Sequence, residues 1–189
     1  MKISVAKDAG YCFGVRDAVN MAYDATEKFG SVYMLGDIVH NERVVNDLAN
    51  AGAKEVETLD DIPDDSPVLF RAHGTLNKLW DESSDKNMKV IDATCPLVTK
   101  VHNEAKKYSK DGRKLILVGH EGHQEVKGTM GQEQMHLIDD REKINPNLPK
   151  WEKNTPLTIL TQTTLSEDDT QRSISTIQNN FNKWNLRSS

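Results

Sequence analysis

Three absences limit what this sequence can encode. Its 189 residues contain only two cysteines, so at most one disulfide can form, and a reducing compartment disfavours even that one. No apolar run approaches the roughly 20 residues of a membrane-spanning helix, and the apolar part of the N-terminus is too short for a signal peptide. The net charge of −5 leaves no basic footprint for nucleic acid. These absences predict a cytoplasmic protein without nucleic acid or membrane partners.

Short β-branched runs alternate with helical patterns along the chain. Strands are expected at residues 3–6, 32–35, 68–71, 89–92, 115–119, 135–138 and 157–160. Helices are expected at residues 15–29, 76–83 and 96–109, after Asn41 and after Ser166. The glycine-rich stretch that leads to Gly131 is expected to be a loop, and the final NKWNLRSS to hold no strand.

This alternation predicts an α/β fold with mostly parallel sheets. Pro96 suits the first position of a helix, and that helix is the natural divider of the chain. We therefore expect two similar small α/β domains. The first covers residues 1–95, with an N-terminal strand and a loop at Cys12, and the second covers residues 96–189.

Polar and nucleophilic residues follow the predicted strands. Ligands of open parallel sheets bind beyond the carboxyl ends of the strands, so these residues are functional candidates. They are Cys12, His40, Asn41, His73, Gly74, Cys95, His120, His123, Glu125 and residues 161–164. Five of the six histidines lie in or beside these positions or in the helix after Cys95, where His102 is expected at the surface or in a hydrogen bond. This clustering favours a functional site over scattered structural residues.

The candidate set suits an anionic ligand beside a soft metal. Thiolates bind iron and zinc well, while histidines, hydroxyls and loop amides can hold phosphate oxygens. Glu125 is a candidate proton donor, provided that its surroundings raise its pKa. There is no C-x-x-C pair, Walker loop or dinucleotide fingerprint. For Cys12 and Cys95 three interpretations stay open: a disulfide, two unrelated buried thiols, or two ligands of one metal centre.

Six motifs together resemble the 4-hydroxy-3-methylbut-2-enyl diphosphate reductase family, also called LytB. They occur in the expected order: GYCFGVRDAV, GDIVHN, AHG, DATCPLVTKVH, GHEGHQEVKGTMGQ and TQTTLS. The resemblance implies an oxidoreductase of the non-mevalonate pathway of isoprene biosynthesis. Such an enzyme removes the allylic hydroxyl of its diphosphate substrate and gives isopentenyl and dimethylallyl diphosphate. The resemblance further implies a [4Fe-4S] cluster and a ferredoxin or flavodoxin as electron donor.

The resemblance also assigns roles to residues of this chain. It implies that Cys12 and Cys95 are ligands of the cluster. It implies substrate contacts, chiefly to the diphosphate, for His40, His73, His123 and Thr163. Glu125 would relay protons to the allylic carbon or to the departing hydroxyl. Thr163 would help to orient the group that receives the proton.

The family fold implied by the resemblance has three similar α/β domains in a trefoil-like arrangement around a central cavity. Its third cysteine lies in the third domain, and this chain has no third cysteine. We therefore expect the third domain to be absent and the chain to be a truncated form that is inactive alone. Two alternatives stay open: a dimer whose chains share one cluster, and a non-catalytic module that binds diphosphate. A zinc hydrolase that uses His120, His123 and Glu125 would have poor ligand spacing.

Overall fold

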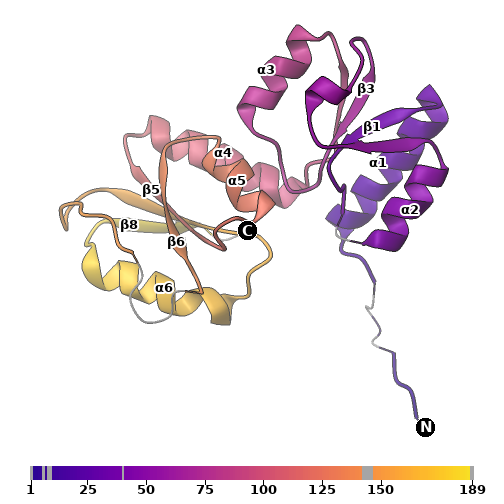
Figure 1. The fold of residues 1–189 in the computed structure, drawn as a ribbon. Coiled ribbons are helices and arrows are strands. Elements are labelled where there is room, and N and C mark those ends of the chain that lie inside the picture. The colour runs from indigo at the N-terminus through magenta and orange to yellow at the C-terminus, as the bar shows by residue number, and fades with distance from the viewer. Residues whose placement is uncertain (1, 6, 8–9, 40, 142–146, 188–189) are drawn as a thin grey trace. The chain divides into compact units, whose positions relative to one another are not determined.

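The computed structural model describes residues 2–5, 7, 10–39, 41–141 and 147–187. These residues form two parallel sheets of four strands each, with helices packed against them (Figure 1). Two compact units result, one made of Met1–Ala72 with Lys86–Cys95 and the other of His73–Asp85 with Pro96–Ser189. The predicted α/β class with parallel sheets is confirmed, while the trefoil-like arrangement stays a prediction.

The first unit holds a sheet with the strand order β2-β1-β3-β4. Its strands are β1 (Val32–Leu35), β2 (Ala53–Val56), β3 (Pro67–Phe70) and β4 (Lys89–Asp92). Its helices are α1 (Phe13–Phe29), α2 (Glu42–Asn50) and the short 3-10 helix η1 (Leu59–Asp61). Ala18, Ala22 and Ala25 repeat at helical spacing and are buried against the sheet in one apolar core. Small side chains on this face let α1 lie close to the strands.

Local signals end and begin the helices of this unit as expected. Gly30 follows α1 with φ +73°, and its N–H donates to the carbonyl of Thr26 at 2.8 Å. A positive φ favours glycine there because other residues have a Cβ that clashes. Asn41 caps α2, since its Oδ1 accepts from the N–H of Val44 at 3.1 Å. The predicted end of α1 and the predicted start of α2 are confirmed, whereas α1 begins at Phe13, two residues before the expected start.

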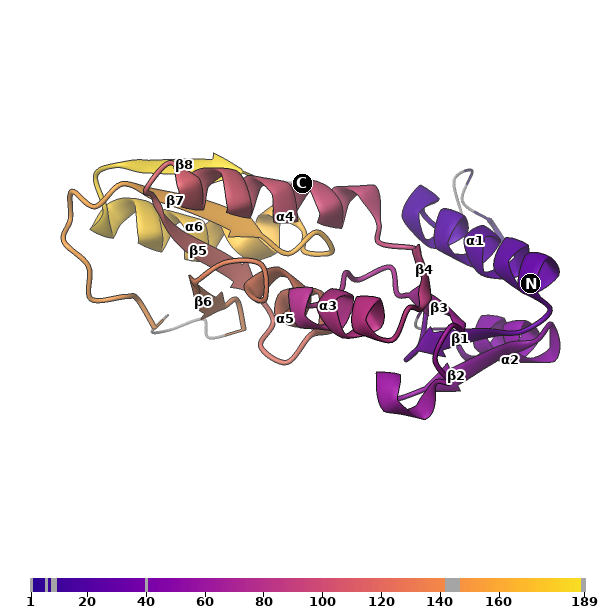
Figure 2. The same ribbon diagram turned by 90° about the horizontal axis from the view of Figure 1, so that it is seen from above.

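The second unit holds a sheet with the strand order β6-β5-β7-β8. Its strands are β5 (Lys114–Gly119), β6 (Met135–Asp139), β7 (Leu157–Thr161) and β8 (Trp184–Arg187). Its helices are α3 (Asn77–Asp85), α4 (Pro96–Lys110), α5 (Gln124–Met130) and α6 (Glu167–Asn180). Both faces of this sheet are covered, by α4 on one side and by α6 on the other (Figures 1 and 2).

The packing on the two faces of β5 explains why the sequence of this strand is a continuous apolar run. Ile116 and Val118 belong to the core beneath α6, whereas Leu115 and Leu117 belong to the core that contains α4 and α5 residues. Successive side chains of a strand point to opposite faces, so a sheet covered twice needs apolar residues at every position. This arrangement places the C-terminal end of β5, and the loop that follows it, between helices on both sides.

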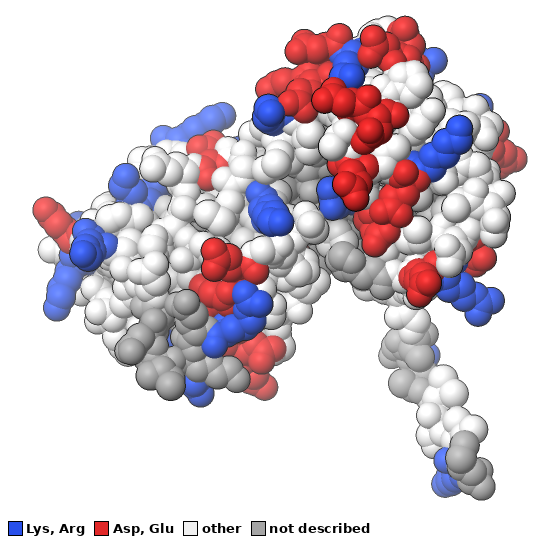
Figure 3. All heavy atoms as spheres, viewed as in Figure 1, with Lys and Arg blue, Asp and Glu red and all other residues white. Residues whose placement is uncertain are grey.

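Most charged side chains of the described residues lie at the surface, and Glu125 is a buried exception. On the face drawn in Figure 3, lysine and arginine are mixed with aspartate and glutamate, and no continuous basic surface is formed. Within the described ranges, no helix is both long and apolar enough to cross a membrane.

Four expectations about the fold are corrected. Residues 3–5 of the expected N-terminal strand are in no strand, and Ile3 and Val5 are 74% and 80% exposed; Ala6 lies outside the described residues. The stretch that leads to Gly131 contains α5 rather than only a loop. Two edge strands, β2 and β8, were not expected. Edge strands gain their order from backbone pairing with β1 and β7, so they need no apolar run of their own.

The division of the chain also differs from the expected cut at residue 96. Helix α3 lies between β3 and β4 in sequence, yet His73–Asp85 group with the second unit. Within that unit, Leu76 packs closely on Gly131, since a Cβ added at Gly131 would lie only 2.3 Å from Leu76 Cδ2. Asn77 Nδ2 donates to the Gly131 carbonyl at 3.3 Å. Such contacts join segments far apart in sequence.

Candidate active site

The two cysteines lie at strand and helix ends of the first unit. Cys12 is the N-cap residue of α1, with extended backbone at φ −62° and ψ 164°, and its side chain is exposed. Cys95 follows β4, and its N–H donates to the carbonyl of Ala72 at 2.9 Å. Neither sulfur is in a disulfide, and neither cysteine is buried. The interpretation as two unrelated buried thiols is therefore wrong.

Gly14 brings the side chain of Cys95 to the start of α1. A Cβ placed on Gly14 would lie 2.5 Å from Cys95 Sγ and 3.2 Å from Cys95 Cβ. Cys95 thus packs against the first turn of the helix that Cys12 caps, two residues beyond Cys12. This packing brings two thiol residues from distant sequence positions to one end of one helix, which suits two ligands of a shared centre.

The second unit holds a buried carboxyl group. Glu125 is only 2% exposed, and its Oε1 accepts from the N–H of Thr163 at 2.6 Å while its Oε2 accepts from Thr163 Oγ1 at 3.0 Å. Burial raises the pKa of Glu125 above its ordinary value, and the two hydrogen bonds from Thr163 oppose this rise because they favour the ionised form. Glu125 therefore meets the condition on which its interpretation as a proton donor depended.

Two of the candidate histidines lie near the start of the helix that carries Glu125. His123 is the N-cap residue of α5, and its Nδ1 accepts from the N–H of Glu125 at 3.1 Å. The rings of His73 and His123 meet edge to face, with centroids 5.8 Å apart and planes at 85°. The second unit thus brings together four of the predicted residues: His73, His123, Glu125 and Thr163.

The turn that carries His73 is held by tight packing on two sides. Gly74 has φ +85°, and a Cβ there would lie 2.7 Å from His102 Cε1. A Cβ on Gly128 of α5 would lie 3.2 Å from the carbonyl oxygen of Gly74 and 3.3 Å from that of His73. His102, expected at the surface or in a hydrogen bond, is only 8% exposed and packs against this turn. The two glycines let the backbone of the turn approach both helices.

The sequence profile of the LytB protein family matches residues 3–188 of the chain. The chain belongs to the LytB family. The 4-hydroxy-3-methylbut-2-enyl diphosphate reductases of Pseudomonas putida and Pseudomonas fluorescens are 47% and 44% identical to it, over 96% of this chain and 59% of theirs. The chain thus spans about three fifths of the length of the curated relatives that it matches.

Solved structures agree with this membership. The chain superposes on the E-1-hydroxy-2-methyl-but-2-enyl-4-diphosphate reductase of Plasmodium falciparum with a TM-score of 0.88 and 32% identity, over 96% of this chain and 57% of that one. A second solved (E)-4-hydroxy-3-methyl-but-2-enyl diphosphate reductase gives a TM-score of 0.81 and 28% identity, over 98% of this chain and 66% of that one. The resemblance inferred from the six motifs is therefore confirmed at the level of the family.

The predicted residues of this LytB chain fall into two sets. Cys12 and Cys95 are in the first unit, and the second unit holds the four residues around Glu125. His40 lies outside the described residues. No three His, Cys, Asp or Glu side chains in the described part of the chain are grouped so that they could hold a metal ion. The two thiols are consistent with two ligands of a cluster, but they do not make a complete set of cluster ligands.

Two buried glutamines hold loops of the second unit together: Gln162 was among the candidates that follow the last predicted strand, and Gln132 was not among the candidates. Gln162 Oε1 accepts from the N–H of His120 at 3.0 Å, and its Nε2 donates to Thr164 Oγ1 at 2.7 Å. Gln132 Nε2 donates to the carbonyls of Thr75 and Gly128 at 3.2 and 3.1 Å. Both amides join loops that are distant in sequence. Gln162 lies within the TQTTLS motif and Gln132 ends the GTMGQ stretch, and these positions within motifs were the sequence signal for their importance.

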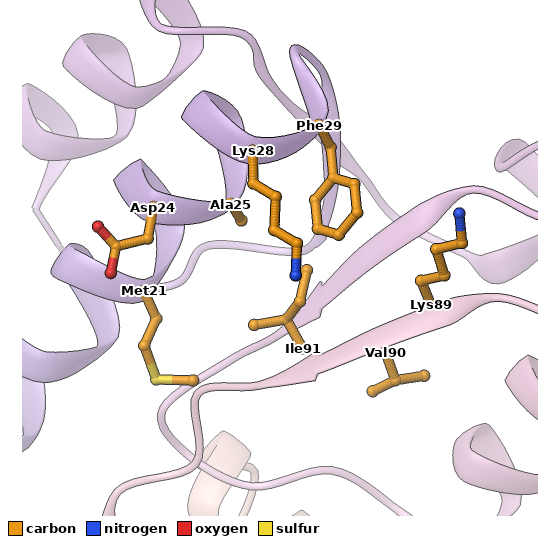
Figure 4. Close-up of a pocket in the computed structure, with 8 residues that line it drawn as sticks. All are labelled: Met21, Asp24, Ala25, Lys28, Phe29, Lys89, Val90 and Ile91. Carbon is orange, nitrogen blue, oxygen red and sulfur yellow. The ribbon is translucent and has the colours of Figure 1, made fainter.

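A cavity of about 640 Å³ lies elsewhere in the first unit (Figure 4). It is lined by residues of α1 and β4: Met21, Asp24, Ala25, Lys28, Phe29, Lys89, Val90 and Ile91. None of the predicted site residues of this LytB chain is among them. The mixed lining, with an acidic and two basic side chains over an apolar floor, offers no convergent set of polar groups for catalysis.

The raised pKa of Glu125 predicts a pH-dependent stability. Because the folded pKa lies above the ordinary value of 4.5, the stability that Glu125 contributes is complete below that value and is lost as the pH rises through the folded pKa. Glu125→Gln carries no charge, so we expect its free energy of unfolding to rise relative to the wild type across this window. The gain is about 1.4 kcal/mol for each tenfold difference in proton affinity between folded and unfolded states.

Urea unfolding of both proteins between about pH 4 and pH 8 measures this difference. Glu121→Gln is the matched control, because Glu121 lies in the turn just before α5 and is exposed. We expect the control to follow the wild type at every pH. A difference between Glu125→Gln and the wild type that stays constant with pH contradicts the prediction.

Proposed function

We propose that this chain carries part of the active site of a reductase that removes the allylic hydroxyl of 4-hydroxy-3-methylbut-2-enyl diphosphate. The observation that carries the proposal is that one chain holds both a thiol set at α1 and a buried carboxyl, hydroxyl and imidazole set around Glu125. Membership of the LytB family supports it. The products would be isopentenyl and dimethylallyl diphosphate.

Cys12 and Cys95 would hold an iron–sulfur cluster of the [4Fe-4S] type. Their thiolates suit iron, and the missing side chain of Gly14 leaves room for Cys95 Sγ beside the helix start. When bound, the cluster would supply the electrons that no side chain can supply. Ferredoxin or flavodoxin would be the electron donor. A cubane cluster needs more ligands than two thiolates. A third domain or a second copy of the chain would provide the others.

The residues around Glu125 would hold the substrate and move protons. The raised pKa keeps a proton on the Glu125 carboxyl to higher pH than usual, which suits a proton donor. Thr163 is only half-buried, so its Oγ1 is the more accessible end of the hydrogen-bonded pair and would pass the proton outward and orient the substrate. His73 and His123, together with His40, would bind the diphosphate.

Two other functions are the alternatives to this proposal. A dimer would supply two cysteines from each copy to one cluster. A non-catalytic module would retain affinity for diphosphate through His73 and His123. We favour the reductase, located in the cytoplasm and active only with further ligands for its cluster, because one chain carries both the two cysteines and the residues around Glu125.

Anaerobic reconstitution of this chain with iron and sulfide tests the proposal. Iron and sulfide per chain, the EPR spectrum of the reduced protein and its sedimentation are measured together. A cubane signal in a dimer supports cluster sharing between copies. Iron bound by a monomer supports ligation by Cys12 and Cys95 alone. No bound iron in this chain, and none when it is joined to the remaining part of the Pseudomonas putida reductase, overturns the proposed function.

A further inference from the structure

We propose that Gly14 is a positioning residue: its missing side chain gives Cys95 Sγ a place against the first turn of α1, beside Cys12. The inference rests on the proposed function of the two cysteines as ligands of one centre. It concerns how this chain brings two thiols together before any metal is bound.

The backbone at Gly14 gives no reason for a glycine. Gly14 is the second residue of α1, and it is buried within a helix of 17 residues. Its φ is not positive, unlike that of Gly30 or Gly36, so an alanine would adopt the same conformation without strain. Alanine is also the best helix former and glycine one of the poorest. The local sequence would therefore be more favourable with alanine at this position.

The reason for the glycine is the space that Cys95 occupies. An added Cβ would lie 2.5 Å from Sγ, 3.2 Å from Cβ and 3.9 Å from Cα of Cys95. No carbon and sulfur atoms that are not bonded to each other approach to 2.5 Å, so the thiol or the helix start must move. The backbone of Cys95 is held by the hydrogen bond from its N–H to the Ala72 carbonyl. The side chain of Cys95 is therefore the part that moves.

Displacement of Cys95 Sγ would separate the two thiols. Cys12 is the N-cap residue at the same helix end, and its backbone is held by the helix, since its carbonyl accepts from the N–H of Arg16 at 3.0 Å. Ligand atoms of a metal site must be held within about 0.5 Å of their working geometry. A single methyl group at position 14 is thus expected to move the two sulfur atoms out of their working geometry without removing either thiol.

A bifunctional thiol reagent tests the pair directly. Dibromobimane becomes fluorescent only after both of its arms have alkylated thiols a few ångströms apart, whereas monobromobimane reports each thiol singly. Reduced, metal-free wild type, Gly14→Ala and the control Asp17→Ala are treated with each reagent. Asp17 is exposed on the next part of α1, so its replacement changes the helix surface and leaves position 14 untouched. Cys12→Ser and Cys95→Ser give the background from one thiol.

We expect rapid bridging in the wild type and in Asp17→Ala. Gly14→Ala is expected to bridge about tenfold more slowly, with single alkylation within about twofold of the wild type, because the thiols stay present but lie apart. If Gly14 had a purely structural role, Gly14→Ala would change the rates of reaction with both reagents to the same extent. Equal bridging in Gly14→Ala and the wild type, or no bridging in the wild type, overturns the inference.

A second measurement applies if Gly14→Ala is too unstable for labelling. Removal of the sulfur by Cys95→Ala leaves Cβ as the nearest atom, at 3.2 Å rather than 2.5 Å. We expect Gly14→Ala to lower the melting temperature less in the Cys95→Ala background than in the wild type. Equal losses in both backgrounds contradict a conflict with Sγ.

Failure of this inference and failure of the proposed function give different results. If Gly14→Ala bridges like the wild type while the wild type binds iron, the role of Gly14 is wrong and the cluster function stands. If the wild type bridges and Gly14→Ala does not, yet no iron binds in any form of the protein, Gly14 positions the thiols but the proposed cluster function is wrong.

Discussion

Anaerobically reconstituted protein with Cys12→Ser or Cys95→Ser is expected to retain little or no iron. Each substitution replaces a soft thiolate by a hydroxyl and leaves one cysteine in the chain. Loss of a metal ligand is expected to cost more than the 10- to 100-fold typical of groups around a metal site, so we expect a decrease of affinity on the order of a hundredfold or more. Iron analysis and the visible absorption of the desalted protein measure it.

The control for this experiment is Tyr11→Phe. Tyr11 precedes Cys12 and is 50% exposed, so the change alters the neighbourhood of the thiol and leaves both sulfurs in place. We expect the control to bind as much iron as the wild type. Iron at the wild-type level in either serine variant shows that the two thiols are not ligands of one centre.

Glu125→Gln lowers turnover by about 10²- to 10⁴-fold, the usual contribution of a positioned acid or base. The amide cannot donate the proton that the raised pKa keeps on the carboxyl. It can still accept from the N–H of Thr163, and a rotated Thr163 hydroxyl can accept from it, so the local packing is kept. Iron content is therefore expected to be unchanged while the reaction is lost.

Turnover is measured on this chain joined to the remaining part of the Pseudomonas putida reductase, because the chain matches 59% of that protein. Glu121→Gln in the same fusion is the matched control and is expected to be as active as the unmodified protein. Normal turnover by Glu125→Gln, with normal iron content, rules out the carboxyl as the proton donor.

Much of the fold could be predicted because its signals are local. The caps at Asn41 and Ser166 and the proline at position 96 mark helix starts within a few residues. Strand β5 holds the apolar run LILV, and β7 alternates little between apolar and charged residues and is buried at every position, as expected for a sheet covered on both faces. These features depend on neighbours in the sequence, so no tertiary structure is needed to find them.

Other elements could not be predicted because distant residues create them. Helix α5 contains Gly128 and is bounded by Gly131, which argue for a loop in isolation. Gly128 is needed because α5 packs on the carbonyls of His73 and Gly74. Strand β8 has exposed ends and is ordered by its pairing with β7. In each case a contact made by the fold outweighs the local preference.

The candidate site divides in the same way. The sequence by itself determined the chemical groups and their family, because those follow from residue type and order. It also placed Cys95, His73 and Thr163 after strands, but the strand expected before Cys12 is not formed in the described residues. Only the tertiary structure decided that Cys95 packs at Gly14, that Thr163 hydrogen-bonds Glu125, and that the Glu125 carboxyl is buried with a raised pKa. The physical reason is that distance and desolvation belong to residues brought together from separate segments, and neither is encoded in any one of those segments.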